Sequence, residues 1–291
     1  MTASREVSLC GGSVNSPQLL MLSGIGDPDH LSDLGIEATV ASPRVGANLQ
    51  DHVMVALVMA SRDPVTLVDA EKPGELLNYL ARRRGMLTSN VGEAAAFFRT
   101  DGDLPAPDIE LIFGPVPYID HGQIEEDPGH GFALGPILLQ PQSRGSVTLA
   151  SADPTVSPLI DPGYFTAAGD RATMRTGLRR ALALLEVAPL ASMVGEPIEA
   201  PAGDDDASID EFLDEQCETL YHPVGTCAMG TDEDAVVDPE LRVRGVEGLR
   251  VADASVMPSL NRGHTHAPAV MIGERAAVLV REVRTRPTVG R

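Results

Sequence analysis

The hydrophobic and polar positions of this chain follow two periods, and both recur along its length. Short apolar runs with the length of single strands occupy residues 6–10, 53–60, 135–140, 145–149 and 248–253. Runs of this size, bounded by Gly, Pro and polar residues, are typical of strands. Only a short polar segment around Ser143 separates the third and fourth runs, so we predict that these two runs form an antiparallel hairpin.

Apolar residues spaced three or four apart predict helices between these strands. The predicted helices cover residues 17–23, 28–34, 170–187, 208–220 and 267–283. Ser16 is the predicted N-cap of the first helix, and Pro17 follows it at a position where proline is favoured. Ser208 and Glu211 form a predicted capping box for the fourth helix, which should deliver His222 at its C-terminal end. This mixture of elements predicts an α+β or α/β fold.

Composition and charge narrow the classes of function. The chain has 291 residues, of which 43% are hydrophobic and 22% charged, as is ordinary for a globular protein. Its formal net charge of -20 opposes binding to nucleic acid or to an anionic membrane surface, because both are negatively charged. No apolar run approaches the roughly 20 residues of a membrane span. The strand-like residues 6–10 leave no room for a signal peptide, so a cytoplasmic location is expected.

Two histidine-containing motifs near the end of the chain carry the candidate chemistry. Residues 221–230 read YHPVGTCAMG, and residues 263–268 read GHTHAP at the start of a predicted helix. These motifs resemble the catalytic signature of the glucose-methanol-choline (GMC) family of flavin-dependent alcohol oxidoreductases, in particular choline dehydrogenase-like members. The segment 11–26 and the segment 45–52, which reads VGANLQDH, are similar to two further motifs of that family.

This resemblance implies a domain organisation. The chain is similar to roughly the C-terminal half of a full-length family member. Residues 1–51 and 224–291 would form part of a Rossmann-like FAD-binding domain that lacks its N-terminal βαβ unit. Residues 52–223 would form a substrate-binding domain with an antiparallel sheet and helices.

The sequence contains no phosphate cradle for FAD. A Rossmann unit binds pyrophosphate on a Gly-x-Gly-x-x-Gly turn at the N-terminus of a helix. The nearest candidate begins at Gly24 and Gly26, has Asp29 at the third glycine position, and is better interpreted as the end of a helix. We therefore expect this chain alone to bind FAD weakly. A separate N-terminal Rossmann-type chain, or self-association, would complete its open sheet.

The resemblance also implies roles for individual residues. Oxidation of a small-molecule alcohol to a carbonyl removes a hydride, which would pass to N5 of FAD, and a proton, which needs a base. His222 would be the principal base, and His264 would be the second group that hydrogen-bonds the same oxygen. The implied cofactor-binding residues are Tyr221, Asp253, Ala254, Thr265 and His266.

Other interpretations of the same residues remain open. The chain could be a non-catalytic fragment or one subunit of a split enzyme, and the histidine pair could serve a flavin-independent lyase. A metal site is not expected, because the candidate ligands have no closed Cys/His spacing: His222, Cys227, His264 and His266. The other histidines lie in turn-like contexts and are expected to be surface or capping residues: His30, His52, His121 and His130. The three cysteines are expected to be reduced thiols: Cys10, Cys217 and Cys227.

Overall fold

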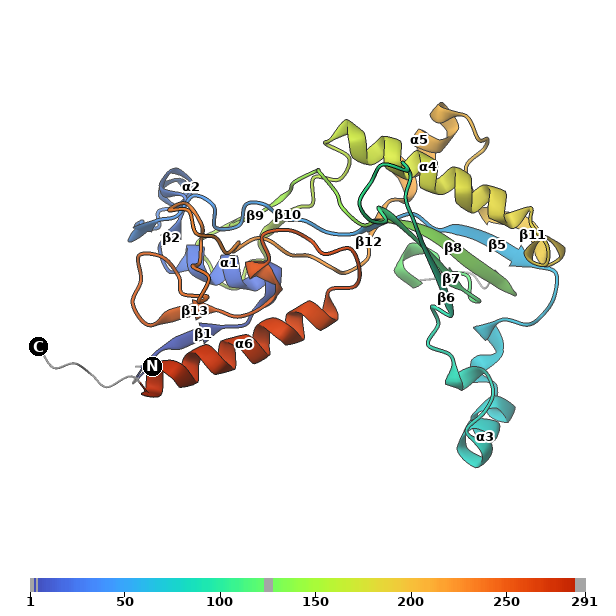
Figure 1. Cartoon of the computed structure of the whole chain (residues 1–291), viewed down its shortest axis with the longest axis horizontal. Helices are drawn as coiled ribbons and strands as arrows, with labels where there is room; N and C mark the ends of the chain where they lie inside the picture. Colours follow the sequence, from blue (N-terminus) through green and yellow to red (C-terminus); the bar gives the residue numbers. More distant parts are fainter. Residues whose placement is uncertain (1–2, 4, 123–127, 286–291) are drawn as a thin grey trace, which may run out of the picture. The chain divides into compact units, whose positions relative to one another are not determined.

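The structure is a computed structural model that describes residue 3, residues 5–122 and residues 128–285. The chain divides into two compact units (Figure 1). Unit 1 consists of Met1–His52, Pro141–Thr166 and Tyr221–Arg291, and unit 2 consists of Val53–Gln140 and Ala167–Leu220. No helix among the described residues is both long enough and apolar enough to cross a membrane.

Among the described residues, unit 1 contains two parallel strand pairs and one antiparallel pair, and unit 2 contains the larger sheet. The elements of unit 1 are β1 (Val7–Leu9), α1 (Gly12–Leu22), β2 (Ile25–Gly26), α2 (Pro28–Asp33), β3 (Val40–Ala41), β9 (Ser146–Thr148), β10 (Leu159–Asp161), β13 (Leu249–Val251), η5 (Ala254–Val256) and α6 (His266–Thr285). The elements of unit 2 are β4 (Val53–Met54), β5 (Leu57–Ser61), η1 (Leu67–Glu71), α3 (Pro73–Arg82), η2 (Met86–Thr88), β6 (Ala94–Phe98), β7 (Ile109–Gly114), η3 (Asp120–Gly122), β8 (Gly131–Leu138), α4 (Ala168–Leu185), η4 (Leu190–Ser192), β11 (Val194–Glu199), α5 (Asp206–Gln216) and β12 (Glu218–Thr219).

One apolar cluster organises unit 1 and draws on both ends of the chain. Strand β1 pairs in parallel with β13, so that Val7 lies opposite Leu249 and Leu9 lies opposite Val251. The cluster combines buried side chains from α1, β13 and α6: Leu20, Met21, Val251, Ile272, Ala276 and Leu279. Helix α6 thereby covers this two-stranded sheet (Figure 1). The long-range pairing and the shared apolar cluster thus bring the N-terminal and C-terminal parts of the chain together in unit 1.

The start of α1 differs from the sequence-based prediction, whereas its end and the start of α2 are confirmed. Helix α1 begins at Gly12 with Gly11 at the N-cap, so Ser16 lies inside the helix and is not its cap. Helix α1 ends before Gly24, whose φ of +79° lies in the left-handed region that glycine adopts readily. At α2, an Asp27 carboxylate oxygen accepts the amide hydrogen of Asp29 at 2.9 Å, which caps the helix.

Unit 2 is built on a seven-stranded sheet; helix α4 packs on this sheet, and α5 packs against α4. The main path of the sheet is β11-β5-β8-β4-β12, and β7 pairs with both β8 and β6. Helix α4 packs on β7 and β8. Gly177 allows this close approach, because an added Cβ there would lie 3.1 Å from the Cβ of Pro136. The resulting arrangement is the antiparallel sheet with helices that the sequence predicts.

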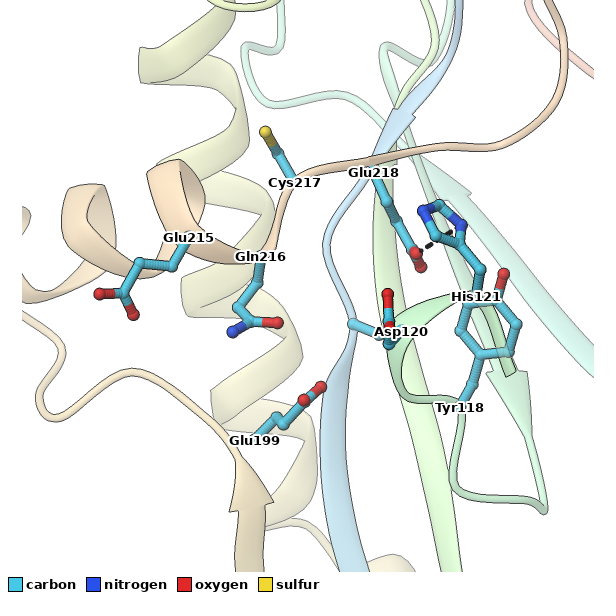
Figure 2. Close-up of a pocket in the computed structure, with 9 residues that line it drawn as sticks. Tyr118, Asp120, His121, Glu199, Glu215, Gln216, Cys217 and Glu218 are labelled. Atoms are coloured by element: carbon cyan, nitrogen blue, oxygen red, sulfur yellow. Dashed lines mark ion pairs between the residues drawn. The ribbon is translucent and has the colours of Figure 1, made fainter. Parts of the chain in front are cut away.

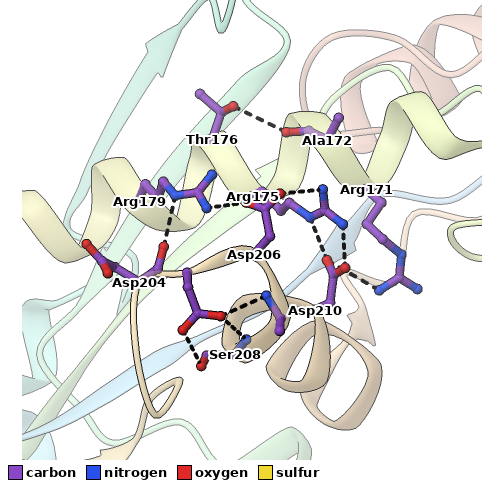
Figure 3. A network of polar contacts seen from close by, with 11 residues as sticks. Arg171, Ala172, Arg175, Thr176, Arg179, Asp204, Asp206, Ser208 and Asp210 are labelled. Atoms are coloured by element: carbon purple, nitrogen blue, oxygen red, sulfur yellow. Dashed lines mark hydrogen bonds and ion pairs between the residues drawn. The ribbon is translucent and has the colours of Figure 1, made fainter.

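Arginine side chains of α4 pair with aspartates around α5 (Figure 3). Arg171 binds Asp214 at 2.6 Å, and Nε of Arg175 lies 2.6 Å from a carboxylate oxygen of Asp210. Arg179 also pairs with Asp206. Because these arginines recur every four residues, they share one face of α4. Because Asp206, Asp210 and Asp214 all lie within α5, these ion pairs join α5 to α4.

The predicted hairpin of residues 135–149 is wrong. Strand β8 belongs to the large sheet of unit 2, whereas β9 pairs with β10 in unit 1. The amide of Val147 donates to the carbonyl of Gly46 at 2.7 Å, and Gly145 bridges to Leu49. In agreement with these hydrogen bonds, residues 141–166 belong to unit 1, although the sequence-based prediction assigned them to the substrate-binding domain. The functional names of the two domains remain predictions.

The approach to His222 also differs from the prediction. Helix α5 begins one turn earlier than the predicted capping box, because Asp205 accepts the amide hydrogens of Ala207 and Ser208 and acts as the N-cap. The helix ends at Gln216, and β12 follows it. His222 therefore lies in a loop, beyond a strand, and not at the C-terminal end of a helix.

Candidate active site

Three histidine rings from separate parts of the sequence gather in unit 1. The ring centroids of His222 and His264 are 5.0 Å apart, and the planes of the two rings meet at 83°. His52 also contacts His222, with ring centroids 5.1 Å apart and an angle of 78° between the ring planes. The structure thus brings together the two histidines that the sequence paired and adds a third.

Direct hydrogen bonds hold the histidine cluster. Nδ1 of His52 lies 2.9 Å from Nδ1 of His222, and Nε2 of His52 lies 3.0 Å from the carbonyl oxygen of Asn261. Among the described residues, Nε2 of His222 has no hydrogen-bond partner. His52 is buried, His222 is half-buried and His264 is exposed. His264 is therefore the exposed member of the cluster, and His52 is the buried one.

The main chain of His222 is fixed by the residue next to His52. A carboxylate oxygen of Asp51 accepts the amide hydrogen of His222 at 2.9 Å, and the other accepts the hydroxyl hydrogen of Tyr164 at 2.6 Å. Tyr221 precedes His222 with a φ of +59°, in the left-handed region. The buried Asp51 therefore fixes the backbone of His222. The residue before it, Tyr221, has a backbone conformation that non-glycine residues seldom adopt.

A glycine in the first histidine motif permits close packing of two loops. Gly225 has a φ of +96°, and an added Cβ would collide with the carbonyl oxygen of Asn48. Beside it, Gln50 and Val224 exchange backbone hydrogen bonds of 3.0 and 2.8 Å. The loop that carries His222 is thus pinned to the segment that carries Asp51 and His52.

Burial and neighbouring rings change the acid-base properties of His222. Burial, followed by the nearby His52 and His264 rings, lowers the pKa of His222 to about 4, against a smaller opposing effect of Asp51. An imidazole with so low a pKa is neutral at pH 7. The ring nitrogen that lacks a partner can therefore accept a proton.

The residues predicted to bind a cofactor occupy different environments. Asp253 is engaged within the chain: one carboxylate oxygen accepts from the amide of Gly12 at 3.0 Å and from the hydroxyl of Ser16 at 2.6 Å. Ala254 begins η5, and Thr265 is buried before α6. Tyr221 and His266 are exposed, Tyr221 at 62%. Of these five residues, Tyr221 and His266 are therefore the two with exposed side chains.

Sequence analysis missed four residues of this cluster: Asp51, His52, Tyr164 and Asn261. The expectation that His52 is a surface or capping residue is wrong, because its side chain is only 1% exposed. The motif of residues 45–52 could have singled out His52, but a sequence motif does not predict which residue the imidazole ring contacts. The contact joins residues 170 positions apart, which local patterns do not encode.

The other histidines lie outside this cluster. His30 accepts the amide hydrogen of Leu149 at 3.1 Å, and His130 hydrogen-bonds Thr66 at 2.7 Å. His121 pairs with Glu218 at 3.0 Å. No group of three or more His, Cys, Asp or Glu side chains suited to a metal ion occurs among the described residues.

An acidic pocket of ≈ 320 Å³ lies within unit 2 (Figure 2). Its lining includes His121 and Glu218, together with Asp120 and Glu199. Burial, with Asp120, raises the pKa of Glu199, and burial raises that of Glu218 despite the nearby His121. None of the predicted site residues lines this pocket, so it does not contribute to the histidine cluster.

Comparison with known proteins places these features in a family context. Two family models described as GMC oxidoreductase match residues 1–54 and residues 141–273. An uncharacterised GMC-type oxidoreductase of Mycobacterium tuberculosis is 54% identical over 285 residues, covering 96% of this chain and 53% of the relative. An alcohol dehydrogenase [acceptor] of Pseudomonas putida is 42% identical, covering 97% of this chain and 52% of the relative.

A solved structure of a variant formate oxidase of Aspergillus oryzae, studied for its FAD modification, has a similar fold. The TM-score is 0.89 at 30% identity, covering 97% of this chain and 55% of that chain. This chain therefore spans about half the length of the relatives that it matches.

Proposed function

Because this chain belongs to the GMC oxidoreductase family, we propose that it supplies the proton-transfer site of an FAD-dependent enzyme that oxidises a small alcohol to a carbonyl. The observation that carries the proposal is the pairing of His222 with His264, with Nε2 of His222 unpartnered among the described residues. We assign His222 as the principal base. His264 is the group that orients and hydrogen-bonds the same alcohol oxygen.

The basicity of His222 decides how the proton must move. An unactivated hydroxyl has a pKa near that of water, about 15.7. The pKa of His222 is about 4, so complete proton transfer before any other step would cost roughly 12 pKa units, or about 16 kcal/mol. The proton must therefore pass to Nε2 of His222 as the hydride leaves carbon. A hydrogen bond from His264 to the same oxygen would lower the barrier further.

The residues present fit one end of FAD and not the other. FAD, when bound, would accept the hydride from the alcohol carbon. The histidine pair and the exposed His266 at the first turn of α6 suit the isoalloxazine ring, because the N-terminal end of a helix carries partial positive charge. The sequence contains no Gly-x-Gly-x-x-Gly turn for the pyrophosphate. We therefore propose that a Rossmann-type N-terminal segment supplies the pyrophosphate contacts.

The open two-stranded sheet of unit 1 supports such a partner. Among the described residues, β1 pairs only with β13, whereas the other edge of β13 forms an isolated antiparallel bridge between Arg250 and Arg242, so the open edge of the pair is that of β1. Parallel sheets of two strands are rarely stable alone and are normally buried within larger sheets. An N-terminal segment that adds strands beside this pair would extend the sheet and cover the exposed Val7.

Reconstitution with flavin tests the proposal. The chain is co-expressed with the N-terminal half of the Mycobacterium tuberculosis relative, and the absorbance of retained flavin is followed after gel filtration. Anaerobic addition of choline and of primary alcohols should then bleach the flavin. In the matched His222→Ala complex, flavin should remain bound and bleaching should slow by about a hundredfold to ten-thousandfold, the usual effect of losing a general base. Equal bleaching rates in the two complexes would refute the role of His222.

A further inference from the structure

His52 takes no part in the proposed chemistry, yet it is the most buried member of the histidine cluster. Its side chain is 1% exposed, and both of its ring nitrogens lie within hydrogen-bond distance of a partner. When both nitrogens of a buried imidazole have fixed hydrogen-bond partners, those partners determine which nitrogen carries hydrogen. The identities of those partners therefore constrain where the ring protons lie.

The carbonyl of Asn261 determines which nitrogen of His52 carries hydrogen. A carbonyl oxygen can only accept a hydrogen bond, so Nε2 of His52, 3.0 Å away, must carry the hydrogen. In a neutral imidazole, the second nitrogen then has a lone pair and no hydrogen. Nδ1 of His52 is consequently an acceptor that faces His222.

The position of the hydrogen on His222 follows from that on His52. Nδ1 of His52 and Nδ1 of His222 are 2.9 Å apart, so one of them must donate. Since Nδ1 of His52 is the acceptor, Nδ1 of His222 carries the hydrogen, and Nε2 of His222 is left with the lone pair. We propose that His52 is a positioning residue which, through the Asn261 carbonyl, holds His222 in the tautomer whose Nε2 can accept the substrate proton.

Asn261 connects this relay to the second histidine. Its side-chain amide donates to the carbonyl oxygen of Gly263 at 2.7 Å and to that of His264 at 3.3 Å. The carbonyl of the same residue binds His52. Asn261 therefore fixes the proton on His52 and holds the loop that presents His264. Asn261 thus contacts both the ring of His52 and the backbone of His264.

This inference rests on the proposed function for its meaning in catalysis, but the tautomer itself is a property of the chain alone. A protonated His52 would give the opposite pattern: both of its nitrogens would donate, Nδ1 of His222 would accept, and Nε2 of His222 would carry the hydrogen. That form of His222 could not act as a base at Nε2. The two patterns are therefore distinguishable without flavin or substrate.

Nitrogen-15 NMR of the full chain with labelled histidine tests the tautomer at pH 7.5. Coupling patterns and nitrogen shifts show which ring nitrogen carries hydrogen, and the signals of His222 are identified by their loss in His222→Ala. We expect hydrogen on Nδ1 and a bare Nε2 in the wild-type chain. Hydrogen on Nε2 in the wild-type chain overturns the proposal before any further variant is needed.

Substitution of His52 tests its part. His52→Leu replaces the imidazole by an apolar side chain of similar size, which removes the acceptor, and should shift His222 toward the form with hydrogen on Nε2. His52→Asn keeps an acceptor oxygen near the place of Nδ1 and should restore the wild-type pattern at least in part. His130→Asn, a half-buried histidine of unit 2, is the control and should leave His222 unchanged.

The outcomes separate this inference from the proposed function. An unchanged His222 tautomer in a folded His52→Leu chain overturns the assignment to His52. If the tautomer shifts as expected while the flavin complex fails to oxidise any alcohol, the positioning role stands and the proposed function fails. If both hold, His52→Leu in the flavin complex should lower kcat more than it changes KM, since the substrate contacts remain.

Discussion

A carboxylate oxygen of Asp253 accepts a hydrogen bond of 2.6 Å from the hydroxyl of Ser16, a residue 237 positions away in the chain. The same oxygen accepts the amide hydrogen of Gly12 at 3.0 Å. The other oxygen accepts the amide hydrogen of Ser255 at 2.8 Å. Asp253 therefore joins the N-terminal part of α1 to the start of η5.

Asp253→Asn should destabilise the chain substantially. The substitution replaces one acceptor oxygen by an amide that opposes a donor, and hydrogen bonds to charged groups contribute about 1.5–3 kcal/mol each. We expect a loss of about 2–4 kcal/mol in the free energy of unfolding, measured by urea denaturation. Asp153→Asn is the control, because Asp153 also accepts two hydrogen bonds, from Thr155, but lies exposed. Equal losses in both variants would contradict the bridging role of Asp253.

Substitutions of the two histidines of the second motif should impair different properties of the flavin complex. His264→Asn should lower kcat less than His222→Ala does, because the amide can still hydrogen-bond the substrate oxygen. His266→Ala should mainly weaken flavin retention, since His266 is exposed at the first turn of α6. Stopped-flow bleaching and flavin titration separate the two effects. An inactive His264→Asn beside an active His222→Ala would exchange the assigned roles.

Acid should destabilise the chain in part through His222. Its pKa is about 4 in the folded chain against 6.5 for an unperturbed histidine, so the unfolded chain binds more protons between these values. The free energy of unfolding should therefore fall as the pH drops from 6.5 to 4, by about 2–3 kcal/mol from this residue. Carboxyl groups with raised pKa, such as Glu199 and Glu218, act in the opposite direction.

The contribution of His222 is isolated by comparison with His222→Ala. Urea unfolding of both proteins at pH 7, 5.5 and 4 should give a smaller acid loss in the variant, because the carboxyl groups are the same in each. Parallel pH dependence in the two proteins would show that His222 does not titrate with a lowered pKa in the folded chain.

Exposed apolar residues of unit 1 should make the isolated chain prone to self-association. Val7 is 45% exposed on β1, and Val270 and Met271 are 53% and 64% exposed on α6. Exposed apolar side chains beside an open parallel strand pair favour association. We expect dimers or larger species in light scattering and binding of a hydrophobic dye, both reduced in Met271→Gln. A monomer at high concentration without dye binding would contradict this prediction.

The sequence alone determined the features that depend on near neighbours along the chain. Asp27 and Pro28 specified the start of α2, because a cap and its helix lie within three residues of each other. The spacing of apolar residues specified α4, which buries Leu178, Ala181 and Leu185 on one face. The motifs of residues 221–230 and 263–268 identified His222 and His264 as a pair, which the structure places in ring contact.

Only the tertiary structure decided which distant segments meet. Residues 135–140 and 145–149 both had strand patterns, but their hydrogen-bond partners lie in different units, and the periodicity of a strand carries no information about its partner. His52 shows the same limit at the site. Its sequence neighbours suggested a turn, whereas burial against His222 and Asn261 gave it two fixed partners. The sequence alone gives the chemical nature of each side chain, but the contacts that set the protonation of a histidine ring form only when the chain folds.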